Sequence, residues 1–180
     1  RAVQVNAGIW AKELKVVMGA NLIDASSLRG NTTPVSTPIA GSGAVPSFAL
    51  DVAQLGGMYA GKIYLIGTEA GLGVLSADTL GATGGDLVLQ NNGWLTTTGV
   101  LQASSNLQIS TQGNISNTGT LYASNDQTLI ATGSVSNTGI LAAQGNTSIT
   151  AQSLSSNAAS VLAAGVKADG TLTNSGSLSV

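Results

Sequence analysis

Two consecutive stretches of this chain carry nearly the same phrase, GNISNTGTLYASNDQTLIAT at residues 113–132 and GSVSNTGILAAQGNTSITAQ at residues 133–152. A more divergent copy, GWLTTTGVLQASSNLQISTQ, occupies residues 93–112. Equivalent positions therefore recur every twenty residues. A fixed period of this length indicates a repeat protein, in which each unit buries its apolar side chains only by stacking against its neighbours.

Particular residue types are retained at this step. If each unit forms one turn of a coil of parallel strands, equivalent side chains stack about 4.8 Å apart. We expect the leucines to form an interior ladder, the asparagines a hydrogen-bonded amide ladder, and the glycines the corners, where a positive φ is often needed. The series are Gly93, Gly113 and Gly133; Gly99, Gly119 and Gly139; Leu101, Leu121 and Leu141; Ala103, Ala123, Ala143 and Ala163; Asn117, Asn137 and Asn157.

Apolar residues alternate with polar ones over short runs, as in Ile63 and Leu65 or Leu107 and Ile109, and few recur at helical spacing. This alternation is typical of strands. The period is too short for a propeller blade. The leucine-rich-repeat pattern is missing, and no six-residue subperiod supports a left-handed hexapeptide coil. The sequence therefore predicts an all-β fold, a parallel β-helix with turns of about 20 residues.

Two parts of the chain depart from the repeat. SSLRGNTTPVSTPIAGSGAVPSF, residues 27–48, contains all three prolines and little alternation. We expect an extra-helical loop near residues 25–50, with the coil resuming near Asp51. The repeat weakens after Ser153 and returns out of phase in TLTNSGSLSV at the C-terminal end. At least one late turn should therefore differ in length from the others.

Composition excludes several classes of function. Charged residues make up 8% of the chain, the formal net charge is −2, and the six basic residues are scattered, which argues against nucleic-acid binding. The chain contains no Cys and no His, so disulfides, Cys/His zinc sites and Cys- or His-based catalysis are excluded. No apolar run is long enough to predict a transmembrane segment.

An enzyme remains an alternative, because polysaccharide lyases and glycosidases also use β-helices. Glycoside hydrolysis needs two carboxylates facing each other, and no two fall in register at the repeat step near a basic residue. The glycine-rich stretch 67–73 lacks a following Gly-Lys-Ser/Thr, and GATGGD at 81–86 occurs only once. We therefore predict no catalytic, cofactor-binding or metal site. The carboxylates considered are Glu13, Asp24, Asp51, Glu69, Asp78, Asp86, Asp126 and Asp169.

Other side chains have two interpretations each. Lys62 and Glu69, seven residues apart, form either a structural ion pair or a solvated pair of charges. The aromatic rings are either platforms for carbohydrate or, as we expect, caps of the core and fillers of wide corners. Asn31, Asn114 and Asn146 begin glycosylation sequons that are expected by chance in so Asn-, Ser- and Thr-rich a chain. The rings are Trp10, Tyr59, Tyr64, Trp94 and Tyr122.

Two stretches resemble known segments. RAVQVNAGIWAKELKVVMGAN at 1–21 resembles the end of the secretion domain of two-partner-secretion exoproteins. DVAQLGGMYAGKIYLIGTEAGLGV at 51–74 resembles the segment that follows it in filamentous haemagglutinins and contact-dependent growth inhibition toxins of the CdiA type. The GxxSNTGxLxA units downstream are similar to that family's haemagglutinin repeats.

The resemblance implies a right-handed parallel β-helix within a large Gram-negative surface protein. It divides the chain into the end of a secretion domain (1–24), the excursion (25–50), transition turns (51–92) and haemagglutinin-type repeats (93–180). It also implies export through the periplasm by a partner outer-membrane transporter to the outside or the cell surface. A target-cell receptor would be bound by other regions of the parent chain.

These observations favour a non-catalytic stalk or secretion-linked segment of an exoprotein that serves adhesion or contact-dependent delivery of a C-terminal toxin. We expect the fragment to be monomeric. The alternatives are a β-helical carbohydrate-active enzyme and a directly adhesive glycan-binding surface. An ice-binding face is not supported, because the Thr-x-Thr run at residues 96–98 does not recur at the twenty-residue step.

Overall fold

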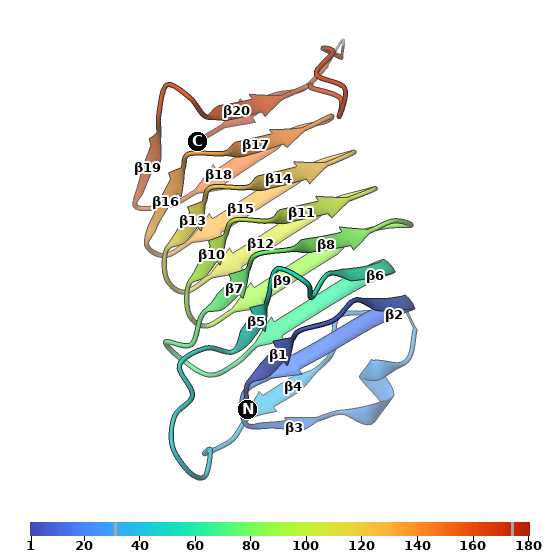
Figure 1. Cartoon of the computed structure of the whole chain (residues 1–180), viewed down its shortest axis with the longest axis vertical. Coiled ribbons are helices and arrows are strands. Elements are labelled where there is room, and N and C mark those ends of the chain that lie inside the picture. The colour runs from blue at the N-terminus through green and yellow to red at the C-terminus, as the bar shows by residue number, and fades with distance from the viewer. Residues whose placement is uncertain (31, 174) are drawn as a thin grey trace.

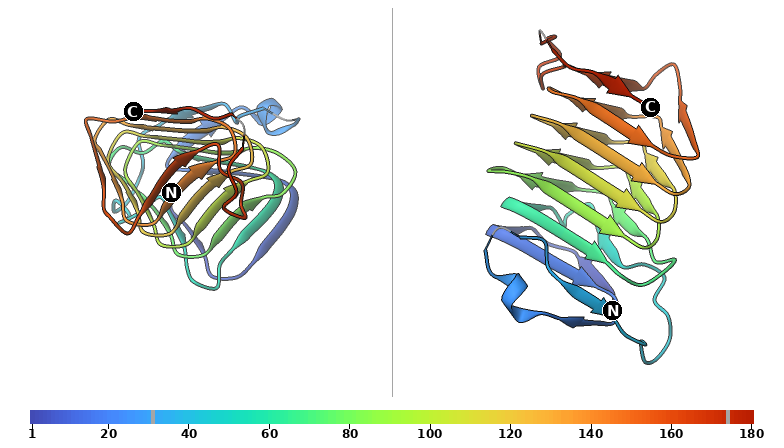
Figure 2. Two further views of the ribbon diagram at one scale, coloured as in Figure 1. Left: turned by 90° about the horizontal axis from the view of Figure 1, so that it is seen from above. Right: turned by 180° about the vertical axis from the view of Figure 1, so that it is seen from behind.

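The computed structural model describes residues 1–30, 32–173 and 175–180. Over these residues the chain is all-β, with one short 3-10 helix, η1 (Ala25–Leu28), and no α-helix. Successive strands wind round a common axis, and each pairs in parallel with the equivalent strand of the next turn (Figure 1). Seen from above, the turns enclose one interior (Figure 2). The predicted parallel β-helix is confirmed.

Three faces make up each regular turn. The first face is a seven-stranded sheet. The second and third faces belong to one larger sheet, because the long strands β2 (Ile9–Met18) and β6 (Met58–Gly67) run along both. The first face contains β1 (Val3–Val5), β5 (Leu50–Val52), β7 (Val74–Ser76), β10 (Leu95–Thr97), β13 (Ile115–Asn117), β16 (Ser134–Asn137) and β19 (Ser153–Ser156). The second contains β8 (Thr79–Ala82), β11 (Val100–Ala103), β14 (Thr120–Ala123), β17 (Ile140–Ala143) and β20 (Val161–Ala164). The third contains β9 (Leu87–Asn91), β12 (Leu107–Thr111), β15 (Gln127–Ala131), β18 (Thr147–Thr150) and β21 (Leu178–Ser179).

The register between turns explains the twenty-residue period. Leu101 pairs with Leu121, and Leu121 pairs with Leu141. All three side chains are fully buried, so the predicted leucine ladder is confirmed. Because side chains alternate across a strand, every second residue of the regular strands points into this interior, and the residues between them face outward. One continuous apolar core therefore runs along the coil axis.

The amide ladder is confirmed in part. Asn117 and Asn137 are both buried, and Nδ2 of Asn117 donates to Oδ1 of Asn137 over 2.8 Å. Asn157 is not the next rung, contrary to the sequence prediction. The register partner of Asn137 is Ser156, because the turn between them is one residue shorter. Asn157 instead lies on an exposed turn, where its side chain accepts the N–H of Ala159.

The late turns contain the predicted change of phase. Ala143 pairs with Ala164, so the expected fourth alanine, Ala163, is one place out of register and pairs with Ala142. Between β20 and β21 the chain makes a second excursion, and Thr147 pairs with Leu178, thirty-one residues later. The irregularity read from the sequence is therefore an inserted loop in the last described turn.

The repeated glycines lie at corners, but the reason given by the sequence analysis is wrong. None of the six has a positive φ. A Cβ atom at Gly119 would overlap the carbonyl oxygen of Gly99, and one at Gly139 would overlap that of Gly119. The corner of Gly99, Gly119 and Gly139 needs glycine because consecutive turns approach too closely there for any side chain.

The described residues of the first excursion lie outside the coil. It leaves at the end of β2 and contains η1 and the antiparallel pair of β3 (Asn21–Ile23) and β4 (Ser36–Pro38). The coil resumes with β5 at Leu50, next to the predicted Asp51. Figure 2 shows the hairpin and η1 on the outside of the first turns. The extra-helical loop predicted near 25–50 is confirmed.

Candidate functional site: the anchored excursion and the outer face of the coil

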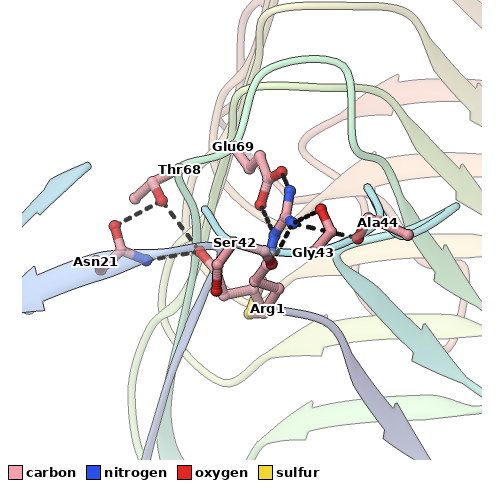
Figure 3. Close-up of polar contacts among 8 residues, drawn as sticks. Arg1, Asn21, Ser42, Gly43, Ala44, Thr68 and Glu69 are labelled. Atoms are coloured by element: carbon pink, nitrogen blue, oxygen red, sulfur yellow. Dashed lines mark hydrogen bonds and ion pairs between the residues drawn. The ribbon is translucent and has the colours of Figure 1, made fainter. Parts of the chain in front are cut away.

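The first excursion is fastened to the coil by Arg1 (Figure 3). Its guanidinium group forms a bidentate ion pair with Glu69, with Nε 3.1 Å from Oε2 and Nη2 bonded to Oε1. The same group donates through Nη1 to the carbonyl oxygens of Ser42, Gly43 and Ala44 at 3.1–3.2 Å. The hydrogen bond from Arg1 holds the pKa of Glu69 below its usual value. Arg1 thus ties the end of the excursion to the corner that follows β6.

A second set of contacts fastens the beginning of the excursion. Nδ2 of Asn21 donates to the carbonyl oxygen of Met18 over 3.0 Å. The Thr68 hydroxyl lies 2.6 Å from Oδ1 of Asn21 and 3.1 Å from the same Met18 oxygen (Figure 3). Asn21 therefore links the first residues of the excursion to the turn after β6, beside Glu69.

Lys15 anchors the middle of the excursion. Its side chain is only 7% exposed. Nζ donates to the carbonyl oxygens of Ser27, Leu28 and Gly30, the last over 2.6 Å. It also lies 3.5 Å from the Glu13 carboxylate and 5.5 Å from the centre of the Tyr64 ring. A charged amine surrounded by carbonyl oxygens, a carboxylate and an aromatic face is well compensated for its burial.

The excursion covers an apolar part of the outer face. Tyr64 and Ile66 point away from the core, yet they are only 5% and 7% exposed. Pro34, Val35, Ser36 and Pro38 line a hollow together with Ile66. Burial also raises the pKa of Tyr64. The excursion is therefore a packed cover on the third face of the coil.

A polar ladder that the sequence analysis missed runs along one corner. The side-chain oxygen of each member accepts the backbone N–H of the member one turn on, over 3.0 Å from Asn106 to Asp86 and 2.8 Å from Asn146 to Asp126. Asp126 N–H donates to Asn106, and Ser177 N–H to Asn146. Asp and Asn alternate, so two carboxylates are never adjacent. The twenty-residue spacing of these residues was visible in the sequence.

Four of the other carboxylates considered in the sequence accept hydrogen bonds. Asp24 caps η1 by accepting the N–H of Ser26, Asp78 accepts the N–H groups of Gly57 and Thr79, and Asp169 accepts that of Thr171. Asp51 accepts the Gln4 amide. Within the described ranges no group of three or more acidic, His or Cys side chains is arranged to hold a metal ion. Asp24, Asp78 and Asp169 therefore stabilise turns, and Asp51 links β5 to β1.

Lys62 and Glu69 do not form the ion pair that was one of the two interpretations, since Glu69 binds Arg1. The charge of Lys62 acts instead on Asp86. Partial burial raises the pKa of Asp86, but hydrogen bonds from Asn106 and Ser105 and the charge of Lys62 outweigh it, and the net shift is downward. Lys62 therefore supports the first rung of the corner ladder.

The predicted role of the aromatic rings is wrong for Trp10 and Tyr59. Both face outward on adjacent strands and stack on each other, with ring centres 5.7 Å apart, and Trp10 is 74% exposed. Tyr64 and Tyr122 are buried outside the core cluster. Trp94 lies against Gly73 at a corner, as predicted. These tyrosines and Trp10 therefore lie on the outer side of the coil wall and not in the core.

Two of the three sequon asparagines lie within the described residues. Asn114 and Asn146 are exposed at corners, where their Oδ1 atoms accept the N–H groups of Ser134 and Ser177. The third sequon begins at Asn31, which lies outside the described residues. In the part of the chain that the structure covers, no helix has the length and hydrophobicity of a membrane span.

Comparison with known proteins extends these observations. A family model described as Haemagglutinin repeat matches residues 16–119 and 117–180. The chain is 46% identical over 111 residues to Toxin CdiA of Yersinia pestis and 46% identical over 104 residues to tRNA nuclease CdiA-2 of Burkholderia pseudomallei, which covers 62% and 58% of this chain. It is 39% identical over 93 residues, 52% of this chain, to 16S rRNA endonuclease CdiA of Enterobacter cloacae.

The aligned region spans about 3% of the length of each of these relatives. No solved structure matches the chain. The family model covers most of the coil, including the irregular turns on both sides of the three similar repeats. The chain therefore belongs to the haemagglutinin-repeat family of filamentous-haemagglutinin and CdiA-type two-partner-secretion proteins.

Proposed function

We propose that this chain is a non-catalytic structural segment of a large secreted surface protein, in which it builds part of a β-helical stalk. The observation that carries the proposal is the continuous ladder of inward leucines, in which each turn completes the core of the one before it. Such a coil extends by about 4.8 Å for each turn of twenty residues. The role of such a coil is to provide length and rigidity.

The relatives bear names of toxins and nucleases. Because the similarity covers so small a part of each relative, we assign no such activity to this chain. Its carboxylates cap turns, as Asp24 and Asp169 do, or pair with basic groups, as Glu69 does, which supports a non-catalytic role. We propose that it carries a functional domain located elsewhere in a parent protein, either an adhesive region or a toxin.

Export is the second part of the proposal. We propose that a partner outer-membrane transporter secretes the parent protein and that the mature protein stands at the cell surface. A chain without cysteine remains free of disulfides on its way through an oxidising compartment. Stacking of one turn on the next would then fold the coil progressively outside the cell.

The experiment compares Leu121→Asp with Ser124→Asp in the parent protein expressed in its own bacterium. Leu121→Asp places an unpaired charge between two turns, whereas Ser124 lies on the turn after β14. We expect Leu121→Asp to lower the amount of full-length protein at the surface, measured by antibody labelling of intact cells, and Ser124→Asp to leave it unchanged. Equal surface amounts for the two variants would contradict a stalk role for this segment.

A second measurement addresses catalysis. The purified chain is incubated with tRNA and with a panel of neutral and acidic polysaccharides, and the products are separated by size. The proposal predicts intact substrates in all reactions. Cleavage that copurifies with the folded chain and is lost on substitution of one of its carboxylates would overturn the non-catalytic assignment.

A further inference from the structure

The second face of the coil bears an aromatic knob near its N-terminal end. Trp10 and Tyr59 are register partners on β2 and β6, and their rings stack with centres 5.7 Å apart. The Trp10 side chain is 74% exposed. Rings of this size bury about 150–250 Å² each when they are covered, and they dominate the energetics of interfaces. The stack is therefore a contact that a partner could cover.

An apolar hollow lies near the other end of the same face. Its volume is about 300 Å³, and it lies between the outer side of β11 to β20 and the second excursion. The buried Ala142 lines it, together with Ile140 and Val161, which are 40% and 43% exposed. The Tyr122 hydroxyl donates to the carbonyl oxygen of Val166 over 3.3 Å and holds the excursion against the face. The hollow is therefore a fixed apolar seat, large enough to receive an aromatic side chain.

The register places the knob and the hollow in one line across strands that lie side by side (Figure 1). Consider a two-fold axis parallel to the strands that passes between β8 and β11. It lays a second copy on this face with its coil running in the opposite direction, and it brings Trp10 of each copy over Ala142 of the other. Both contacts form at once, as in an isologous interface. The residues in line are Trp10, Tyr59, Gly81, Gln102, Tyr122 and Ala142.

The corner between the second and third faces carries a second pair of matching features. Next to the knob there is a hollow of about 600 Å³ at this corner. At the other end the second excursion projects from the same corner, because it follows β20 on the second face and precedes β21 on the third. The two-fold axis sets the excursion of each copy against the corner hollow of the other. The hollow is lined by Lys12, Glu13, Gly61, Lys62 and Gly84.

The charges at these two places are complementary. The excursion exposes Asp169 and Lys167, and the corner hollow presents two lysines and one carboxylate. In the antiparallel arrangement Asp169 of one copy approaches Lys12 and Lys62 of the other. Complementary charges at the rim of an interface fix the register of the two partners.

We propose that two copies of this chain associate through their second faces, with their coils antiparallel and with each Trp10 seated in the apolar hollow of the other copy. From β2 to β20 the face spans six strand spacings, about 29 Å, and five residues along each strand give a width of about 17 Å. The two copies together would cover about 1,000 Å², which is the low end for specific interfaces. We therefore expect a dissociation constant of about 10–100 μM. The chain is monomeric when dilute, and its self-association does not depend on the stalk role.

Sedimentation equilibrium of the 180-residue chain measures this association between about 5 and 500 μM, a range that brackets the expected dissociation constant. We expect the average mass to rise from that of one chain toward that of two. Trp10→Ala should weaken dimerisation at least tenfold, because a buried tryptophan is lost from both contacts. The control is Leu22→Ala, which removes a side chain that is 68% exposed on β3, away from the second face. It should leave the dissociation constant unchanged.

A charge exchange tests the antiparallel arrangement. Asp169→Lys should weaken dimerisation by placing like charges together, and adding Lys12→Glu to this variant should strengthen it again. Thermal unfolding checks that each variant is folded. The proposal is overturned by a monomer at every concentration, by equal dissociation constants for Trp10→Ala and Leu22→Ala, or by further weakening when Lys12→Glu is added to Asp169→Lys.

Discussion

Gln127 is a buried polar residue in a row of aliphatic ones. It pairs in register with Leu107, which pairs with Leu87, and all three side chains point into the core. Both polar atoms of the Gln127 amide are buried without a hydrogen-bond partner among the described residues. Burial of an unsatisfied polar group costs about 1–3 kcal/mol. This position is therefore a local weakness of the core.

We predict that Gln127→Leu stabilises the chain. Removing the unsatisfied amide should raise the free energy of unfolding by about 1–3 kcal/mol, seen as a higher midpoint in thermal unfolding followed by circular dichroism. Gln108→Leu is the control, since Gln108 faces outward on the neighbouring strand and is exposed. An equal shift for both variants, or a lower midpoint for Gln127→Leu, would contradict the assigned orientation of β15.

Asp86 makes the stability of the corner ladder depend on pH. Its pKa is lowered from the ordinary value of 3.8, so its contribution is complete above this value and is lost as the pH falls through the lower folded pKa. We predict that Asp86→Asn weakens the dependence of the unfolding midpoint on pH below about 4. A midpoint that falls just as steeply in the variant over this range would show that the carboxylate makes no such contribution.

At the scale of elements, the first excursion is held by a small number of polar anchors. Lys15 alone donates to three carbonyl oxygens of the segment around η1. The coil beneath the excursion has its own hydrogen bonds between β2 and β6. The excursion should therefore be able to detach while the coil remains folded, as expected for a local unit of lower stability.

We predict that Lys15→Gln exposes the excursion to proteolysis. Limited digestion with an unspecific protease should cut between β3 and β5 faster than in the parent chain, while the circular dichroism of the coil is kept. Lys12→Gln removes an exposed lysine of the same strand and should leave the cleavage rate unchanged. Cleavage at the same rate in both variants would mean that Lys15 does not anchor the segment.

The molecule as a whole is a stack of nearly equivalent turns. In the regular part every ladder advances by twenty residues, so one complete unit is removable without changing any register. We predict that deletion of residues 113–132 gives a folded chain that still unfolds cooperatively, because each turn contacts only its neighbours. Deletion of residues 113–122 should abolish folding, since it shifts inward residues out of their columns.

The repeat was readable because stacking imposes the same constraint on every turn. Leu101, Leu121 and Leu141 repeat in the sequence since each must fill the same place in the core. The prediction for Asn157 was wrong because a turn that is one residue shorter places Ser156 in register with Asn137. The contacts of Arg1 and Lys15 with the excursion follow no period, and nothing in the sequence relates Arg1 to Glu69.

The central claim, that consecutive units are parallel turns in a twenty-residue register, is tested most directly by paired cysteines. The chain has none of its own, so any disulfide reports only the introduced pair. Ser116 and Ser136 are register partners that face outward on β13 and β16. Neighbouring strands place their Cα atoms about 4.8 Å apart, within the range for a disulfide.

We predict that oxidation of the Ser116→Cys, Ser136→Cys chain forms an intramolecular disulfide, seen by mass spectrometry of the peptides before and after reduction. The Ser116→Cys, Ser134→Cys chain displaces the second cysteine by two residues along the same face, beyond the reach of a disulfide, and should stay reduced. Cross-linking of the displaced pair in preference to the register pair would contradict the coil described here.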